Sequence, residues 1–168
     1  MAVLVSDTSI IIDLDRGELL EAAFALDEDF AVPDLLFARE LEGDLGARLQ
    51  GLGLIVEQLT PLEVTQATIL RRADQRLSLP DTFAFALAQG RTWTLLTGDR
   101  GLRAVAEAQG IEVHGTLWIL DRLEAAGTCD TATLHHGLTK TATHPRCRLP
   151  RGEVDQRLKR YQRRSAPS

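Results

Sequence analysis

Residues 3–13 read VLVSDTSIIID, and this stretch decides how the rest of the chain is interpreted. Residues 2–5 are apolar and partly β-branched, which is typical of a buried parallel strand. Apolar residues at helical spacing follow, from Asp7 to about Asp15. An apolar strand that passes directly into a helix is the first unit of an α/β sheet, and Asp7 stands at the junction.

The same alternation continues along the chain. Further strands are predicted at 30–32, 54–56, 93–97 and 111–113, and helices at 18–26, 34–49, 61–77, 82–88, 102–108 and 116–126. Asp34 is expected to cap the helix at 34–49. Leu62, Ile69 and Leu70 lie on one apolar face of the helix at 61–77. Strands and helices at this spacing predict an α/β fold of three layers, a central parallel sheet with helices on both faces.

The length of 168 residues suits one domain with an appendage. Beyond Gly127 the pattern weakens, and only 154–161 suggests a further, short basic helix. We therefore expect a body at 1–127 and a basic C-terminal extension at 128–168. Residues 1–63 carry 14 acidic and 3 basic side chains, whereas residues 131–168 carry 2 and 9. This asymmetry means that cations or the basic end must help if the protein binds nucleic acid.

The two cysteines, Cys129 and Cys147, form no disulfide framework and no metal-binding spacing. No signal peptide is recognisable, and no uncharged run is long enough to span a bilayer. These features predict a cytoplasmic protein that is not attached to a membrane.

Acidic residues stand where a parallel sheet places its ligands. Asp7 and Asp99 follow predicted strands, Asp81 opens the helix at 82–88, and Glu40 lies in the helix at 34–49. The carboxyl ends of parallel strands share one crevice, so these side chains can meet there. Carboxylates in one cleft repel each other, and a hard cation such as Mg²⁺ or Mn²⁺ offsets that repulsion.

Each acid also has a structural interpretation. Asp7 and Asp99 can cap the helices that begin after them, and Ser78 with Asp81 fits a capping box. Glu40 has the alternative of a solvated helix residue, in which case Glu42 or Asp44 would replace it. Asp13, Asp15 and residues 27–29 are expected to be solvated.

Four motifs follow one another along the chain: VLVSDTSIIID at 3–13, VPDLLFAREL at 32–41, LSLPDTFAFALA at 77–88 and LLTGDR at 95–100. In this order they resemble the motifs of PIN domains, as found in VapC-type toxins. The resemblance covers about residues 2–113. GTLWIL at 115–120 is similar to a PIN subfamily with a longer C-terminal extension.

The resemblance implies a PIN-like fold and a metal-dependent endoribonuclease, the toxin of a toxin–antitoxin pair. It implies that Asp7, Glu40, Asp81 and Asp99 hold Mg²⁺ or Mn²⁺ directly or through water. Thr8, Ser9 and Thr97 would position ligands or phosphate. The implied partners are the RNA substrate, a small antitoxin protein and a second copy in a homodimer. Some PIN nucleases carry another acid after the fourth motif, where this chain has Arg100, Gly101 and Leu102.

Other functions stay open at this stage. A PIN fold without catalysis could bind RNA or protein, although acids are intact at all four motifs. A dehalogenase-type phosphohydrolase would need an acid at Ser9, and a receiver domain would need a lysine near Asp99.

The remaining polar and aromatic residues are assigned structural places. The four histidines lack zinc-ligand spacing and are expected at the surface. Trp93 and Trp118 lie in apolar runs and are expected in the core or an interface. The basic tail either contacts phosphates or docks on the acidic first third of the chain or on a partner. It comprises Arg146, Arg148, Arg151, Arg157, Lys159, Arg160, Arg163 and Arg164.

Overall fold

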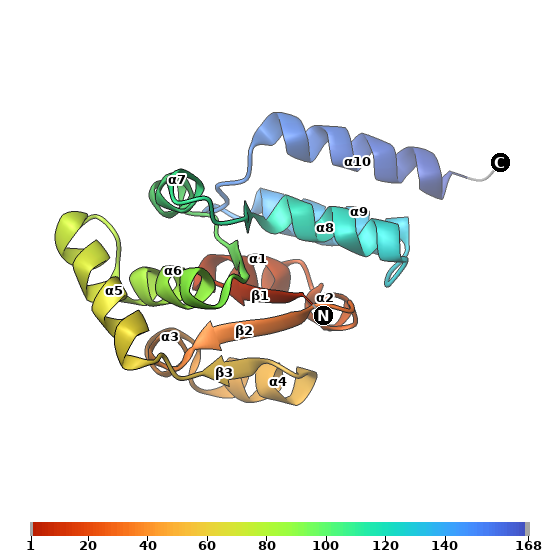
Figure 1. Ribbon diagram of the computed structural model, residues 1–168. Coiled ribbons are helices and arrows are strands. Elements are labelled where there is room, and N and C mark those ends of the chain that lie inside the picture. Colours follow the sequence, from red (N-terminus) through yellow and green to blue (C-terminus); the bar gives the residue numbers. More distant parts are fainter. Residues whose placement is uncertain (1, 167–168) are drawn as a thin grey trace.

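The computed structural model describes residues 2–166 and contains a central sheet of five parallel strands (Figure 1). The strands are β1 (Val3–Ser6), β2 (Asp29–Pro33), β3 (Ile55–Glu57), β4 (Thr94–Leu96) and β5 (Val113–His114). Their order across the sheet is β3-β2-β1-β4-β5. The chain adds strands first on one side of β1 and then on the other, so the carboxyl ends of β1 and β4 form the topological switch point.

Helices cover both faces of this sheet, which confirms the three-layer α/β prediction. The helices before β4 are α1 (Thr8–Arg16), α2 (Leu20–Phe24), α3 (Asp34–Leu36), α4 (Asp44–Leu52), α5 (Pro61–Ala73) and α6 (Leu79–Arg91). Those after it are α7 (Arg100–Ala108), α8 (Thr116–Ala126), α9 (Thr131–Thr143) and α10 (Arg151–Ser165). Helix α6 packs against β1, β2 and β4, whereas α1 packs with α8 and α9. No helix within residues 2–166 is long and apolar enough to cross a bilayer.

The central strand is buried on both faces, as its continuous apolar sequence predicts. Leu4 and Val5 are 1% and 0% exposed, and β1 pairs with both β2 and β4. The long hydrophobic helix α6 covers one face with small residues such as Ala84 and Ala88, which let it approach the strands closely. The buried core thus fixes the switch point rigidly.

The single helix expected at 34–49 is interrupted. Helix α3 passes into a π-helix, η1 (Phe37–Leu41), and a break at Gly43 precedes α4. Gly43 has φ +117°, a left-handed conformation that glycine adopts at little cost. Asp34 is the first residue of α3 and not its cap, which is Pro33. Glu40 lies within η1, and Glu42 is the residue that follows its end, before the break.

The apolar face expected on the 61–77 helix is also different. Leu62 and Ile69 are 67% and 62% exposed, whereas Glu63 and Ala67 are buried. Glu63 is buried because Arg91 of α6 pairs with it and because its side chain lies against Gly90. The helix therefore packs on α6 through a small residue and an ion pair.

Two helices occupy the region where the sequence pattern weakens. Helix α9 packs on α1 and α8, and α10 lies along α9 on the outside of the molecule (Figure 1). Leu134, Leu138, Val154 and Tyr161 belong to the same buried cluster as the core of the sheet.

Candidate active site

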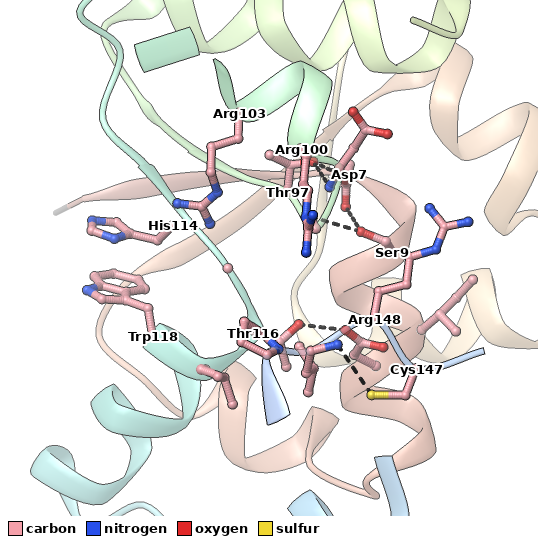
Figure 2. Close-up of a pocket in the computed structure, with 18 of the residues that line it drawn as sticks. Asp7, Ser9, Thr97, Arg100, Arg103, His114, Thr116, Trp118, Cys147 and Arg148 are labelled. Carbon is pink, nitrogen blue, oxygen red and sulfur yellow. Dashed lines mark hydrogen bonds between the residues drawn. The ribbon is translucent and has the colours of Figure 1, made fainter. Parts of the chain in front are cut away.

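A pocket of about 1060 Å³ opens at the carboxyl ends of β1, β4 and β5 (Figure 2). Six of the seven residues singled out from the sequence line it, namely Asp7, Thr8, Ser9, Asp81, Thr97 and Asp99. They come from three separate segments of the chain, and the parallel sheet brings them together as the strand ends predict.

Asp7 is the most buried of the acids, with 3% exposure. It caps α1, because its Oδ1 accepts a hydrogen bond from the amide of Ile10 at 3.2 Å. Ser9 donates to the same oxygen at 2.7 Å, and Thr97 donates to the other carboxylate oxygen. The predicted cap is thus confirmed, and the same carboxylate also faces the pocket.

Burial raises the pKa of Asp7 to about 6, against the opposing hydrogen bonds of Ser9, Thr97 and Ile10. The negative charge of Asp81, which lines the same pocket, raises this pKa further. Within residues 2–166, none of the hydrogen-bond partners of Asp7 is cationic. A cation bound here would offset the burial of this charge.

Thr97 organises the switch point. Its side chain is fully buried, and its hydroxyl also accepts a hydrogen bond from the amide of Asp99 at 3.0 Å. Asp99 in turn caps α7 by accepting from the amide of Leu102 at 2.8 Å. One hydroxyl therefore connects the acid that follows β1 with the acid that follows β4.

Asp81 is held at the start of α6 by the predicted capping box. The amide of Asp81 donates to Ser78 Oγ at 3.1 Å, and the Asp81 carboxylate accepts from the amide of Ser78 at 3.4 Å. The side chain is half-buried and lines the pocket. Asp81 can therefore cap α6 and line the pocket at the same time, because both roles need an acid at the start of this helix.

Glu40 lies beside the pocket without lining it. It is exposed, and Thr8, which does line the pocket, donates a hydrogen bond to its carboxylate. Single π-turns inside helices occur frequently at functional sites, and η1 carries Glu40.

The oxygen ligands that the pocket offers suit a hard divalent cation. Among the described residues, no three His, Cys, Asp or Glu side chains form a ready-made ligand group. Mg²⁺ commonly binds through one or two carboxylates and keeps several waters. Asp7 and Asp81, with the hydroxyls around them and Asp99 in the same pocket, fit a cation held in that manner.

Arginines line the same pocket as the acids. Arg100 and Arg103 come from the first turn of α7, and Arg146 and Arg148 come from the segment before α10. Within residues 2–166, Arg100, Arg146 and Arg148 form no ion pair, so their charges are available to an anion. The sequence indicated the basic tail but not which of its arginines reach the pocket.

Three further side chains in the pocket differ from the expectations. Asp13 is half-buried and accepts a hydrogen bond from Thr116 at 2.8 Å, so it is not solvated. His114 stacks on Trp118, with ring centroids 4.1 Å apart and an angle of 6°. Both rings line the pocket and are half-buried, so His114 is not a free surface residue and Trp118 is not a core residue. Their only sequence signal is that His114 ends a strand at the same sheet edge as Asp7.

Three other arginines of the basic tail form ion pairs within the molecule. Arg157 and Arg160 bind Asp121, and Arg160 and Arg164 bind Glu124, at 2.7–3.2 Å. The docking surface is therefore α8 and not the acidic first third of the chain.

The family comparison agrees with this geometry. No curated protein matches the chain. A family model, DUF3368, described as a PIN domain, matches residues 3–163, which include all four motifs, α9 and all but the last two residues of α10. PIN domains are generally nucleases, and they typically use divalent metal ions. The chain belongs to this PIN-domain family.

Proposed function

We propose that this protein is a Mg²⁺- or Mn²⁺-dependent endoribonuclease, the toxin of a toxin–antitoxin pair. The observation that supports it most directly is the pocket at the switch point. There the buried carboxylate of Asp7 shares one pocket with Asp81, Asp99 and arginines that form no ion pair within residues 2–166. An acidic centre with basic surroundings is suited to a phosphodiester, whose charge needs both a metal and cationic contacts.

Each residue has a defined part in this proposal. Asp7, Asp81 and Asp99 hold the metal directly or through water. Glu40 contributes from beside the pocket, where its carboxylate accepts a hydrogen bond from Thr8. Ser9 and Thr97 keep Asp7 in one orientation by donating to its two oxygens. Arg100, Arg146 and Arg148 bind and orient the phosphates. The metal, when bound, supplies an acidified water and stabilises the charge that develops on the phosphate.

Charge-removing substitutions test the catalytic assignment. Asp7→Asn, Asp81→Asn, Asp99→Asn and Glu40→Gln keep the shape of each side chain but remove the charge that holds the cation. Each is expected to lower Mn²⁺-dependent cleavage of labelled RNA by at least about a hundredfold, because metal and electrostatic catalysis contribute several kcal/mol.

Two exposed acids outside the pocket serve as matched controls. Glu42→Gln and Asp155→Asn remove the same charge from side chains that are exposed and do not line the pocket. They should cleave within about twofold of the wild type, since a tenfold change already needs 1.36 kcal/mol. Undiminished cleavage by Asp7→Asn or Asp99→Asn would refute the assignment. Loss in Glu42→Gln would move the second motif by two positions.

The toxin role, the antitoxin and the homodimer rest on the resemblance of the four motifs. A short DNA-binding protein encoded in the adjacent reading frame, which binds this chain and blocks cleavage, is the expected result. Sedimentation of the purified protein tests the homodimer. Tight RNA binding without cleavage in Mn²⁺ would favour the non-catalytic module instead.

A further inference from the structure

An aromatic pair lines the pocket away from the acids. Trp118 lies in the first turn of α8, and His114 ends β5. Their rings are stacked in parallel at 4.1 Å, and His114 Nε2 lies 3.2 Å from Glu112 Oε1. The Arg122 guanidinium lies 5.8 Å from the Trp118 ring centre. These contacts hold two flat rings in fixed orientation at the pocket wall.

The sheet sets the distance between this pair and the acids. Leu96 is in register with Ser6 on one side and with His114 on the other. Two strand spacings of about 4.8 Å each place the backbone of His114 roughly 10 Å from that of Ser6, next to Asp7. A nucleotide adjacent to a phosphate at the acids can span such a distance.

Positive charge lies along this path. Figure 2 shows Arg103 with the two rings on one side of the pocket, and Asp7, Ser9 and Thr97 on the other. A Cβ placed on Gly115, the residue between His114 and Thr116, would lie 3.1 Å from Arg103 Nη2, so the guanidinium crosses the backbone there. Along the pocket wall, Arg103 therefore lies between the acids and the aromatic pair.

We propose that the His114–Trp118 pair is a subsite on which an unpaired base of the RNA stacks, next to the phosphate at the acids. This inference rests on the proposed function and specifies its substrate as single-stranded at that position. Bases stack on aromatic side chains irrespective of their identity, because every base has a π-face. A pair that only filled the core would be buried, but both rings are half-buried and line an open pocket.

Binding measurements test the subsite without cleavage. In the Trp93→Phe background, Trp118 is the remaining tryptophan of the chain, so its fluorescence reports contact with a base directly. A single-stranded tetraribonucleotide in EDTA should quench this fluorescence. The same oligomer made abasic at all positions keeps its phosphates and should not quench it.

Substitution gives the size of the contribution. Trp118→Leu should weaken binding of the labelled tetranucleotide, followed by anisotropy, by about fivefold to 150-fold, as for the loss of one stacked base. Its affinity for the abasic oligomer and the salt slope should stay unchanged, because no phosphate contact is lost. Trp118→Phe should retain most of the affinity. His114→Ala should reproduce the loss if Trp118→Leu fails to fold, as a melting curve shows.

The outcomes separate this inference from the proposed function. Equal quenching by both oligomers, no quenching by either, or unchanged affinity in folded Trp118→Leu and His114→Ala would overturn the subsite. Those readouts involve no catalysis, so they remain informative even if the wild-type protein does not cleave RNA.

Discussion

At the scale of single residues, the buried carboxylate of Asp7 governs the site. It is 3% exposed, it is held by Ser9, Thr97 and the amide of Ile10, and it lies close to the charge of Asp81. A buried charge without a cation costs free energy, which the fold must offset elsewhere. The cost is removed either by a bound cation or by loss of the charge.

We therefore expect Asp7→Asn to stabilise the metal-free protein while it abolishes cleavage. The amide keeps an oxygen for Ile10 and Ser9 and can donate to Thr97, and the gain should be on the order of 1–3 kcal/mol. Urea denaturation in EDTA measures it. Asp155→Asn, at an exposed site, should change stability by less than about 0.5 kcal/mol. A destabilised Asp7→Asn protein in EDTA would mean that the charge is already compensated.

Local sequence patterns predicted the residue contacts that span one helical turn. The caps at Asp7 and Asp99 and the box of Ser78 with Asp81 were confirmed, because donor and acceptor lie three residues apart. The hydrogen bond from Thr97 to Asp7 joins residues 90 apart, and that from Thr116 to Asp13 joins residues 103 apart. Such contacts depend on how the strands are ordered, which no local pattern states.

At the scale of elements, the docking of α9 on α1 depends on two glycines. A Cβ on Gly137 would lie 2.7 Å from the carbonyl oxygen of Gly17, and one on Gly17 would lie 2.9 Å from that of Gly137. Thr141 adds a hydrogen bond to the carbonyl of Asp13 at 3.1 Å. The backbones approach too closely for any larger residue.

Gly137→Ala should consequently destabilise the protein, even though alanine is the better helix former. Overpacking against backbone atoms costs about 1–3 kcal/mol, whereas the helix propensity returns up to about 1 kcal/mol. Gly152→Ala in α10 is the matched control, because its Cβ would meet nothing within 4 Å. Thermal melts should show a lower Tm for Gly137→Ala and an equal or higher Tm for Gly152→Ala. The reverse order would mean that α9 does not dock as described.

The same close approach explains why the sequence under-predicted this region. Helix α9 contains five threonines and two histidines among its 13 residues and buries only a narrow strip, so its apolar pattern is weak. The helix expected at 34–49 divides at Gly43, and α5 buries Glu63 in preference to Leu62. The sheet itself was predictable, since its strands are short continuous apolar runs. The division into 1–127 and 128–168 stays a prediction.

At the scale of the whole molecule, the basic end is divided between two uses. Arg157, Arg160 and Arg164 bind acids of α8, and Arg157 also lines the pocket. Arg146 and Arg148 line the pocket and form no ion pair within the described residues. The two groups should behave differently towards RNA and towards unfolding.

Arg146→Gln and Arg148→Gln should each weaken RNA binding and reduce its salt slope by about 0.7, the value for one single-strand phosphate contact. Arg164→Gln removes an exposed ion pair with Glu124 and should leave that slope unchanged. Titration of labelled RNA at several salt concentrations measures the slopes. Identical slopes for all three variants would assign the tail to a purely structural role.

Metal binding should stabilise the whole fold by mass action. At a Mn²⁺ concentration a hundred times the Kd, about 2.7 kcal/mol is expected relative to EDTA. The Asp7→Asn protein should lose this increment, because it lacks the central carboxylate. An identical Tm of the wild type in millimolar Mn²⁺ and in EDTA would argue against a cation in the pocket.

Because β1 lies between β2 and β4, its second edge stays unpaired during translation until β4 has been synthesised. Thr97 follows Asp7 by 90 residues, which at about 5–20 residues per second is a delay of roughly 5 to 18 seconds on the ribosome. Until β4 emerges, β1 has one open edge and Asp7 lacks the hydroxyl that orients it. A partly made chain therefore exposes an apolar strand, yet it has no organised acidic centre. A nascent copy is therefore prone to aggregate before its acidic centre is organised.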